Sequence, residues 1–113
     1  MRIIYSKNYD KGLKELKKKH RTAELSVLEE ILDIIKDSGS YEELRQNPVS
    51  YIYDFEELRG DKKGYCSFNL SRTGGIIRLM VRPQMNTIVM EVVFISTNHY
   101  RDFDPKGVMF YDE

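Results

Sequence analysis

Arg78 and His99 are the two residues of the sequence best suited to chemistry. A guanidinium binds phosphate through a planar fork of N–H donors, and an imidazole transfers protons near neutral pH. Arg78 lies inside an apolar run, where a charge is rarely buried alone, so it either opens onto a groove or pairs with an acid. Each residue also has a plain structural alternative: a solvated cross-strand pair for Arg78, and a surface or hydrogen-bonded position for His99. The acids that could pair with Arg78 are Glu56, Glu57 and Glu91.

A basic loop and a polar-aromatic segment accompany these two residues. The loop at residues 59–64 reads RGDKKG, and the segment at residues 98–103 reads NHYRDF. The aromatic residues of the second segment, Tyr100 and Phe103, are either core side chains or surfaces on which a nucleobase stacks. The basic residues of the loop are Arg59, Lys62 and Lys63.

The sequence predicts neither a metal site nor a cofactor site. Its two histidines and single cysteine lie far apart, so no metal-ligand spacing is present. It also has no glycine-rich phosphate loop and no nucleophile elbow. We therefore expect chemistry that needs no cofactor.

Composition and charge are typical of a soluble protein, but the charge is unevenly distributed. The 113 residues have a net charge of zero, and 41% are hydrophobic. Residues 1–21 and 58–101 are basic, whereas residues 22–57 carry ten acidic residues against two basic ones. A basic sheet half suits a polyanion, although charge also fluctuates along any chain this polar.

We expect one domain over residues 1–113, in the cytoplasm and without a membrane segment. This length is sufficient for one core without disulfides, and the lone Cys66 indicates a reducing compartment. No signal peptide begins the chain, and no apolar run reaches membrane-spanning length.

Three strand-like runs in the second half predict an antiparallel meander. Residues 65–70 alternate, and residues 87–96 are apolar almost throughout. In the run 76–82, Ile77, Leu79 and Val81 should lie on one face, and Ile76, Arg78, Met80 and Arg82 on the other. Residues 73–75 and 83–86 supply the turns. Cys66 is in phase with Phe68 and should fill the core. Counting back from the second turn, Arg78 should face about position 91, so that His99 can reach it only if the chain turns back after Ser96.

The first half predicts a short strand, two long helices and further short elements. The strand covers residues 1–5, and Asn8 is expected to cap a helix that ends near residue 20. A second helix covers 22–37 and ends with Gly39 as a left-handed cap. A capping box at 40–43 begins a helix that ends near residue 46, and 51–55 is an expected edge strand. The fold class is therefore α+β: a two-layer protein with an antiparallel sheet of four to five strands and an N-terminal helical hairpin on one face.

In this order the elements resemble the RelE/ParE superfamily of bacterial type II toxins, small ribonucleases neutralised by a partner antitoxin. The likeness spans almost the whole chain and includes F-E-x-L-x-G at residues 55–60, K-G-Y at 63–65, a mid-strand Arg78 and the closing ISTNHYRDF. The spacing from His99 to Phe103 is similar to the H-x-x-x-F/Y ending of the YafQ-like and YoeB-like branches.

The resemblance implies a metal-independent mRNA interferase that acts on the ribosome, where a ribose 2′-OH attacks the adjacent phosphate. By position, Arg78 would stabilise the phosphate charge and His99 would act as acid or base, with Tyr100 beside it. Phe103 and Tyr100 would hold a base. The implied partners are a cognate antitoxin and mRNA, and the N-terminal strand should lie beside the last one. The residues expected to contact RNA are Arg59, Lys62, Lys63 and Arg101.

A second function remains open on the same fold, namely a non-catalytic ParE-like inhibitor or an inactive binding module. The set of Arg78, His99 and Phe103 favours cleavage, because a pure inhibitor has no need of a base beside an arginine. The zero net charge departs from the basic character of ribosome-dependent members, whose affinity depends on phosphate contacts.

Overall fold

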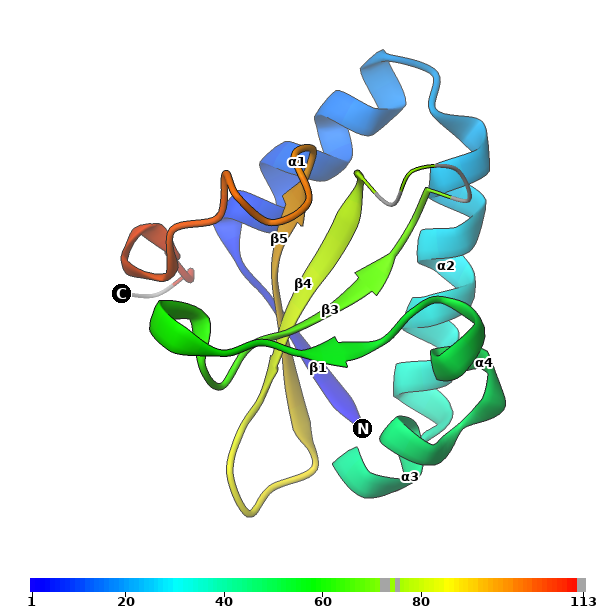
Figure 1. The fold of residues 1–113 in the computed structure, drawn as a ribbon, viewed down its shortest axis with the longest axis vertical. Coiled ribbons are helices and arrows are strands. Elements are labelled where there is room, and N and C mark those ends of the chain that lie inside the picture. The colour runs from blue at the N-terminus through cyan, green and yellow to red at the C-terminus, as the bar shows by residue number, and fades with distance from the viewer. Residues whose placement is uncertain (72–73, 75, 112–113) are drawn as a thin grey trace.

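The fold is a five-stranded sheet with two long helices on one face (Figure 1). The computed structural model describes residues 1–71, 74 and 76–111 of the chain. The elements, in chain order, are β1 (Arg2–Tyr5), α1 (Lys7–Lys18), α2 (Thr22–Asp37), α3 (Tyr41–Gln46), α4 (Pro48–Ile52), β2 (Glu56–Glu57), β3 (Cys66–Asn69), β4 (Arg78–Pro83) and β5 (Val89–Ser96), with 3-10 turns at Gly60–Lys62 and Pro105–Gly107.

The strand order is β1-β5-β4-β3-β2, so the N-terminal strand lies beside the last one, as expected. The α+β class, the strand count and the helical hairpin on one face are confirmed. The sheet is mixed, however, because β1 runs parallel to β5 while the other pairs are antiparallel. The two strands can be parallel because they are not consecutive: the helices lead the chain from β1 to β2 at the far edge, and β3 and β4 bring it back to β5.

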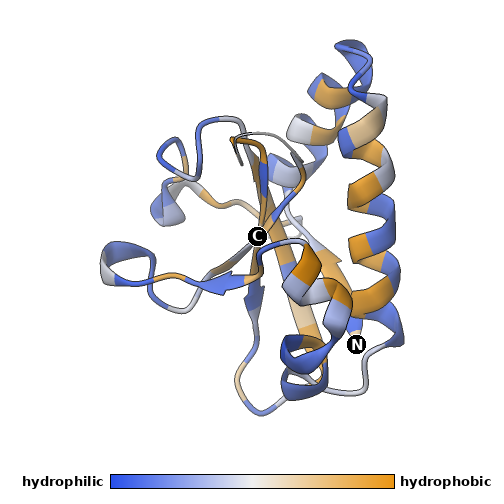
Figure 2. Cartoon of the chain, turned by 45° about the vertical axis from the view of Figure 1, so that its right-hand side comes forward, coloured by the Kyte–Doolittle hydropathy of each residue, from blue (hydrophilic) through white to orange (hydrophobic). Residues whose placement is uncertain are grey.

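One face of the sheet packs against α1 and α2 and forms the main core. Leu79, Val81 and Val92 are fully buried there, together with Ile31 and Ile35 of α2. Figure 2 shows the central strands as largely apolar, and α2 as a helix that alternates between apolar and polar residues along its length. This alternation is the helical spacing from which the sequence predicted the helix.

Ser6, rather than Asn8, caps α1. The Ser6 hydroxyl accepts a hydrogen bond from the Tyr9 amide at 2.9 Å and donates one to the Val93 carbonyl. It can do both because a serine hydroxyl is at once donor and acceptor. Asn8 instead binds the C-terminal segment, through hydrogen bonds with Gly107 and Met109.

Helix α2 ends at Asp37 as predicted, but Gly39 is not a left-handed cap. Ser38 takes the cap position with extended backbone, and its amide donates to the Ile34 carbonyl. The Met1 nitrogen donates to the carbonyls of Ile35 and Lys36, both at 3.0 Å. The last helical carbonyls therefore have partners without a residue at positive φ.

The predicted strand at 51–55 is wrong, because this part of the chain forms α4 and a turn. The Asn47 side chain accepts from the Val49 amide at 2.9 Å, and Pro48 stands at the first helical position, so a new helix begins where the previous one ends. The weak alternation misled the prediction, since Tyr51 and Ile52 are both exposed. The strand that follows, β2, covers only Glu56–Glu57.

The β4–β5 register differs from the predicted one. Pro83 pairs with Met90 and Arg82 with Glu91, so Arg78 lies opposite Ser96 and not opposite position 91. The hairpin loop is longer than the predicted turn, and a bulge between Met80 and Val81 shifts the pairing further. This register moves the end of β5 next to Arg78. The other predicted turn, at residues 73–75, lies mostly outside the described residues.

The second face of the sheet is covered by the C-terminal segment, whose conformation the sequence did not predict. Phe103, Val108 and Phe110 pack against Met80 and Val93 in a smaller apolar cluster. The segment is fixed to the start of α1, where the Lys7 amide donates to the Met109 carbonyl at 2.8 Å. Within the described part of the chain, no helix is long and apolar enough to cross a membrane.

Candidate functional site

Arg78 is a buried charge at the start of β4, on the sheet face opposite the helices. Its side chain is 4% exposed. The guanidinium donates from Nε to the Ser67 hydroxyl at 3.0 Å and from Nη2 to the Asp54 carbonyl at 3.1 Å. Ser67 lies on the neighbouring strand β3, directly opposite Met80. It points to the same face as Arg78 because positions 78 and 80 lie on the same side of β4. These bonds offset the cost of burying the charge.

Glu56 is the acid that pairs with Arg78, at 3.7 Å between its carboxylate and Nη2. Its side chain is 44% exposed, so the carboxylate borders on solvent while the guanidinium is enclosed. The sequence left three acids as possible partners of Arg78, because β2 is only two residues long and shows no alternation that would distinguish them. The structure decides the choice through pairing: Glu56 lies opposite Ser67 and Glu57 opposite Cys66, so their side chains point to opposite faces.

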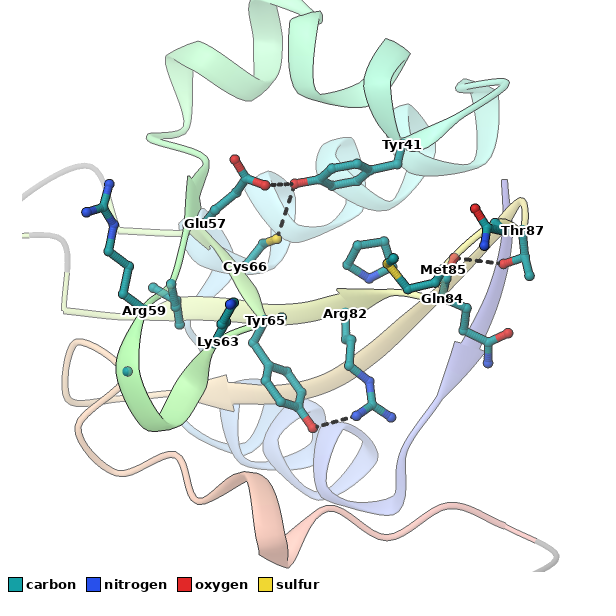
Figure 3. Close-up of a pocket in the computed structure, with 15 residues that line it drawn as sticks. Tyr41, Glu57, Arg59, Lys63, Tyr65, Cys66, Arg82, Gln84, Met85 and Thr87 are labelled. Atoms are coloured by element: carbon teal, nitrogen blue, oxygen red, sulfur yellow. Dashed lines mark hydrogen bonds between the residues drawn. The ribbon is translucent and has the colours of Figure 1, made fainter.

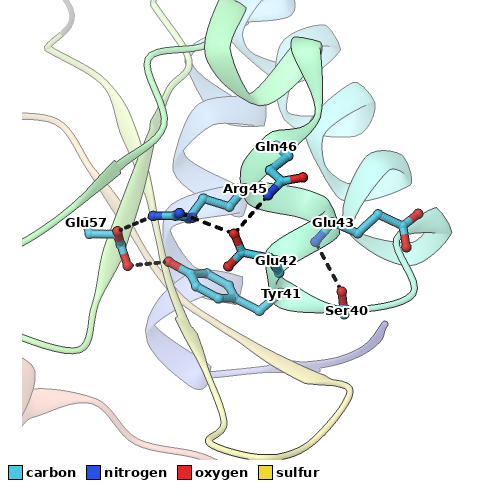
Figure 4. A network of polar contacts seen from close by, with 7 residues as sticks. All are labelled: Ser40, Tyr41, Glu42, Glu43, Arg45, Gln46 and Glu57. Carbon is cyan, nitrogen blue, oxygen red and sulfur yellow. Dashed lines mark hydrogen bonds and ion pairs between the residues drawn. The ribbon is translucent and has the colours of Figure 1, made fainter.

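Glu91 and Glu57 have other partners. Glu91 accepts from Arg82 Nε at 2.6 Å, and this hydrogen bond raises the pKa of Arg82. Glu57 accepts from the Tyr41 hydroxyl at 2.7 Å and from Arg45 at 3.4 Å (Figure 4). Figure 4 shows this second network between β2 and α3, where it connects the edge strand to the helical layer.

His99 lies in a tight turn directly after β5. Its amide donates to the Ile76 carbonyl at 2.8 Å, which places it beside β4, two positions before Arg78 in the chain. His99 and Tyr100 have φ values of 49° and 54°, in the left-handed region that side chains other than glycine rarely adopt. The chain does turn back after Ser96, and the turn lies close to the start of β4. No local sequence pattern predicted this backbone conformation.

Ser96 and Asp102 hold the turn together. The Ser96 hydroxyl accepts from the amides of Asn98 and Tyr100, at 3.2 and 2.7 Å, and donates to Asp102 at 2.5 Å. The other Asp102 oxygen accepts from the Thr97 amide at 3.1 Å. Sequence reasoning missed both residues, because a buried serine and an exposed aspartate have no pattern of their own.

Of the two aromatic candidates, Phe103 is a core residue here and Tyr100 is half-buried. Phe103 is 4% exposed, with ring centroids 5.0 Å from Tyr65 and 5.4 Å from Phe94. A nucleobase could not stack on it without displacing one of these rings. Tyr100 packs at the edge of the same cluster, and its ring centroid lies 4.7 Å from that of His99.

The basic loop lies away from Arg78, beside a pocket of about 1020 Å³ (Figure 3). Arg59 and Lys63 line this pocket with Arg82 and Tyr65, and the Arg82 guanidinium lies 5.1 Å from the centre of the Tyr65 ring. Lys62 is outside it and pairs with Asp61 at 3.9 Å. The candidate cations are thus divided between two places, because Arg101 is exposed on the His99 turn.

The opposite wall of the pocket holds the chain's only cysteine, Cys66. Its sulfur lies 3.6 Å from the Tyr41 hydroxyl, and Figure 3 shows both beside Glu57. Burial raises the pKa of the Cys66 thiol to about 11, so the thiol remains neutral at physiological pH. Burial and the hydrogen bond to Glu57 also raise the pKa of Tyr41. The sequence placed Cys66 in the core, and it is 3% exposed.

No metal-binding group was found in the described residues: no three His, Cys, Asp or Glu side chains lie close enough together. The candidate site therefore consists of Arg78, Glu56 and Ser67 on the sheet, with the His99 turn beside them. It combines a buried, hydrogen-bonded guanidinium, a half-exposed carboxylate and an imidazole.

Solved structures of the Escherichia coli protein YafQ resemble this chain. A histidine-to-glutamine mutant of YafQ superposes with a TM-score of 0.64 at 19% identity, covering 86% of this chain and 93% of that one. The chain has the RelE-like fold of YafQ. YafQ from strain BL21(DE3) gives a TM-score of 0.59 at 20% identity over 86% and 93% of the two chains. YafQ in the DinJ–YafQ toxin–antitoxin complex gives 0.58 at 20% identity over 90% and 96%. No protein-family model matches the chain. No curated protein matches it either.

Proposed function

We propose that this chain is the toxin of a type II toxin–antitoxin system, a metal-independent endoribonuclease in which residues 1–113 form one toxin domain. The substrate is mRNA on the ribosome in the cytoplasm, and a cognate antitoxin holds the toxin inactive. The observation that carries the proposal is the arginine–glutamate pair on the sheet face beside the His99 turn. The likeness to YafQ, whose complex with DinJ is described as a toxin–antitoxin complex, supports the partner.

In the proposed reaction the ribose 2′-oxygen attacks the adjacent phosphorus, and the bond from phosphorus to the 5′-oxygen breaks. The products are a 2′,3′-cyclic phosphate and a 5′-hydroxyl. Glu56, which pairs with Arg78, accepts the 2′-OH proton, and His99 donates a proton to the leaving 5′-oxygen. Arg78 offsets the negative charge that accumulates on the phosphate. Glu56 thus adds a base to the residues chosen from sequence, and His99 takes the role of acid.

The remaining site residues bind RNA in this proposal. Arg101 and Tyr100 flank the scissile phosphate at the turn. Arg59 and Lys63 contact the RNA backbone at the pocket, and Lys62 contacts it from outside the pocket. Phe103 contributes by supporting Tyr100 from within the cluster.

The decisive test replaces His99 with asparagine, which tolerates the left-handed backbone better than alanine but cannot transfer a proton. We expect cleavage by His99→Asn to be roughly 10²–10⁴-fold slower, with RNA binding little changed. The matched control is His20→Asn, because His20 is an exposed histidine that also has a positive φ, of 54°. The assay is single-turnover cleavage with mapping of the new RNA 5′ ends. Wild-type cleavage by His99→Asn would show that the histidine is structural.

The role of Glu56 has its own pair of variants. Glu56→Gln should slow cleavage by roughly 10²–10⁴-fold, because the amide cannot accept the proton. Glu57→Gln, one residue further on and pointing to the other face, should cleave normally. Equal rates for the two variants would exclude Glu56 as the base.

A non-catalytic inhibitor on the same fold is the second candidate, and the burial of Arg78 favours it. Its guanidinium is 4% exposed and already bonded to Ser67 and Asp54, as in a structural arginine. If this candidate is right, induced expression arrests growth without new RNA 5′ ends, and the arrest survives His99→Asn.

A further inference from the structure

The backbone of the His99 turn has an unfavourable conformation that neighbouring groups must stabilise. Two successive non-glycine residues, His99 and Tyr100, have φ values of 49° and 54°. Such a pair persists only when the surrounding structure determines it. The conformation matters because a shift of the turn moves the imidazole relative to β4.

A single hydroxyl–carboxylate pair supplies most of the hydrogen bonds within this turn. Ser96 is completely buried, and its hydroxyl accepts hydrogen bonds from the amides of Asn98 and Tyr100. The same hydroxyl donates to Asp102. The second Asp102 oxygen accepts from the amide and the hydroxyl of Thr97, at 3.1 and 3.4 Å. Removal of the Asp102 carboxylate would leave both the Ser96 hydroxyl and the Thr97 amide without this acceptor.

The turn is also fixed with respect to the rest of the site. Ser96 lies directly opposite Arg78 in the β4–β5 register. The His99 amide is bonded to the Ile76 carbonyl at 2.8 Å, and the His99 ring rests on that of Tyr100. The pair of Ser96 and Asp102 therefore connects the imidazole to the strand that carries the arginine.

We propose that Asp102, acting through Ser96, is a positioning residue that holds the His99–Tyr100 turn in its left-handed conformation and so places the His99 imidazole for proton transfer. The proposal rests on the ribonuclease function proposed above. Asp102 itself takes no proton from the RNA in this assignment. Its effect is to fix where the imidazole lies.

The first measurement separates positioning from binding. Asp102→Ala should lower kcat by about 10²-fold, the loss expected when a catalytic group shifts by about 1 Å, and leave KM nearly unchanged. Asp102→Asn keeps one of the two acceptor oxygens and should fall between Asp102→Ala and the wild type. The matched control is Asp104→Ala, because Asp104 accepts a backbone amide in the same way, from Lys106 at 3.0 Å, but lies outside the turn. We expect its kcat to equal that of the wild type.

A double mutant tests whether the two residues act as one unit. Ser96→Ala alone should lower kcat about as much as Asp102→Ala, and the double mutant should lose no more than either single variant. Additive losses would contradict the proposal, because they would mean that Asp102 does not act through Ser96.

Hydrogen exchange of the His99 amide gives a readout that does not depend on RNA. The amide should be protected in the wild type and in Asp104→Ala, and exchange faster in Asp102→Ala, whereas amides of β4 and β5 keep their protection. Wild-type kcat together with wild-type exchange in Asp102→Ala would overturn the proposal. If the wild type itself cleaves no RNA, the ribonuclease function is wrong, and unchanged exchange in Asp102→Ala would separately show that the carboxylate does not hold the turn.

Discussion

The two faces of the sheet are formed by the same strands but differ in the side chains that they bury. Under α1 and α2, buried positions such as Leu79, Val81 and Val92 are apolar, so this face contributes stability mainly through burial. The opposite face carries the buried polar residues Arg78 and Ser96 as well as the smaller apolar cluster. A short C-terminal segment without a long helix covers it. Polar groups can be kept on that face because each is bonded to a neighbour, and the same bonds hold them in fixed positions.

The two ends of the strands also differ. The Arg78 guanidinium is enclosed and close to the His99 turn, whereas Arg59 and Lys63 line a pocket at the other end. Enclosed charges suit chemistry, since a low dielectric strengthens each interaction, and open ones suit loose contacts with a polyanion.

The largest expected effect comes from truncating one large side chain on each face. Phe103→Ala and Leu79→Ala should each lower the free energy of unfolding by about 2–5 kcal/mol, because both side chains are almost fully buried. Urea denaturation monitored by circular dichroism measures both. If Phe103→Ala unfolds like the wild type but has a raised KM for RNA, its ring is a base platform and the second face is open in solution.

Arg78→Lys tests whether the charge or the fork geometry matters on the second face. Lysine keeps the charge but cannot make the bonds to Ser67 and Asp54 at once. We expect cleavage to fall about 10²–10³-fold, as when a transition-state donor is removed. Arg82→Lys is the matched arginine on the same strand, and its cleavage rate should change less. Identical losses in the two variants would remove the distinction between the two ends of the strands.

Ser6→Ala should lower the free energy of unfolding by about 1–2 kcal/mol, because it removes the cap of α1. Asn8→Ala, at the position favoured by the sequence, should cost less stability and act mainly on the C-terminal segment. Thermal unfolding measures both variants. A larger loss for Asn8→Ala would mean that the cover of the second face matters more than the helix cap.

Cys66→Ala should cost about 1–2 kcal/mol of stability and leave RNA cleavage intact, since the thiol fills space on the helical face. The folded protein should react slowly with iodoacetamide at pH 8, because burial raises the thiol pKa to about 11 and the reactive thiolate is scarce. Mass spectrometry measures the alkylation, and urea should accelerate it. If Cys66→Ala folds normally but does not cleave RNA, the thiol on the helical face has a role in cleavage, and the prediction is wrong.

The smallest expected effect is that of EDTA. Because the described residues contain no group of three metal-ligating side chains, cleavage should proceed at the same rate with and without the chelator. The control is a metal-dependent nuclease in the same buffer, which EDTA must stop. A loss of cleavage that added Mg²⁺ restores would contradict the metal-independent mechanism.

The sequence by itself determined the local elements and the faces of the strands. Alternation placed Ile77, Leu79 and Val81 on one face of β4 and Arg78 with Met80 on the other, and the structure confirms both. Apolar spacing predicted α2 with approximate bounds that agree with the structure, and the capping box predicted the start of α3. Such features follow from neighbours in the chain, whose spacing sets the side on which each side chain points.

Only the tertiary structure decided which segments meet. The parallel pairing of β1, the bulge that brings Ser96 opposite Arg78, and the choice of Glu56 over Glu57 all depend on residues far apart in the sequence. The left-handed turn at His99 depends on Ser96 and Asp102, whose types favour turns in general but do not predict this bond between them. Local patterns cannot encode these features, because a register or a strained turn is selected by the summed contacts of the folded chain, to which each residue contributes little on its own.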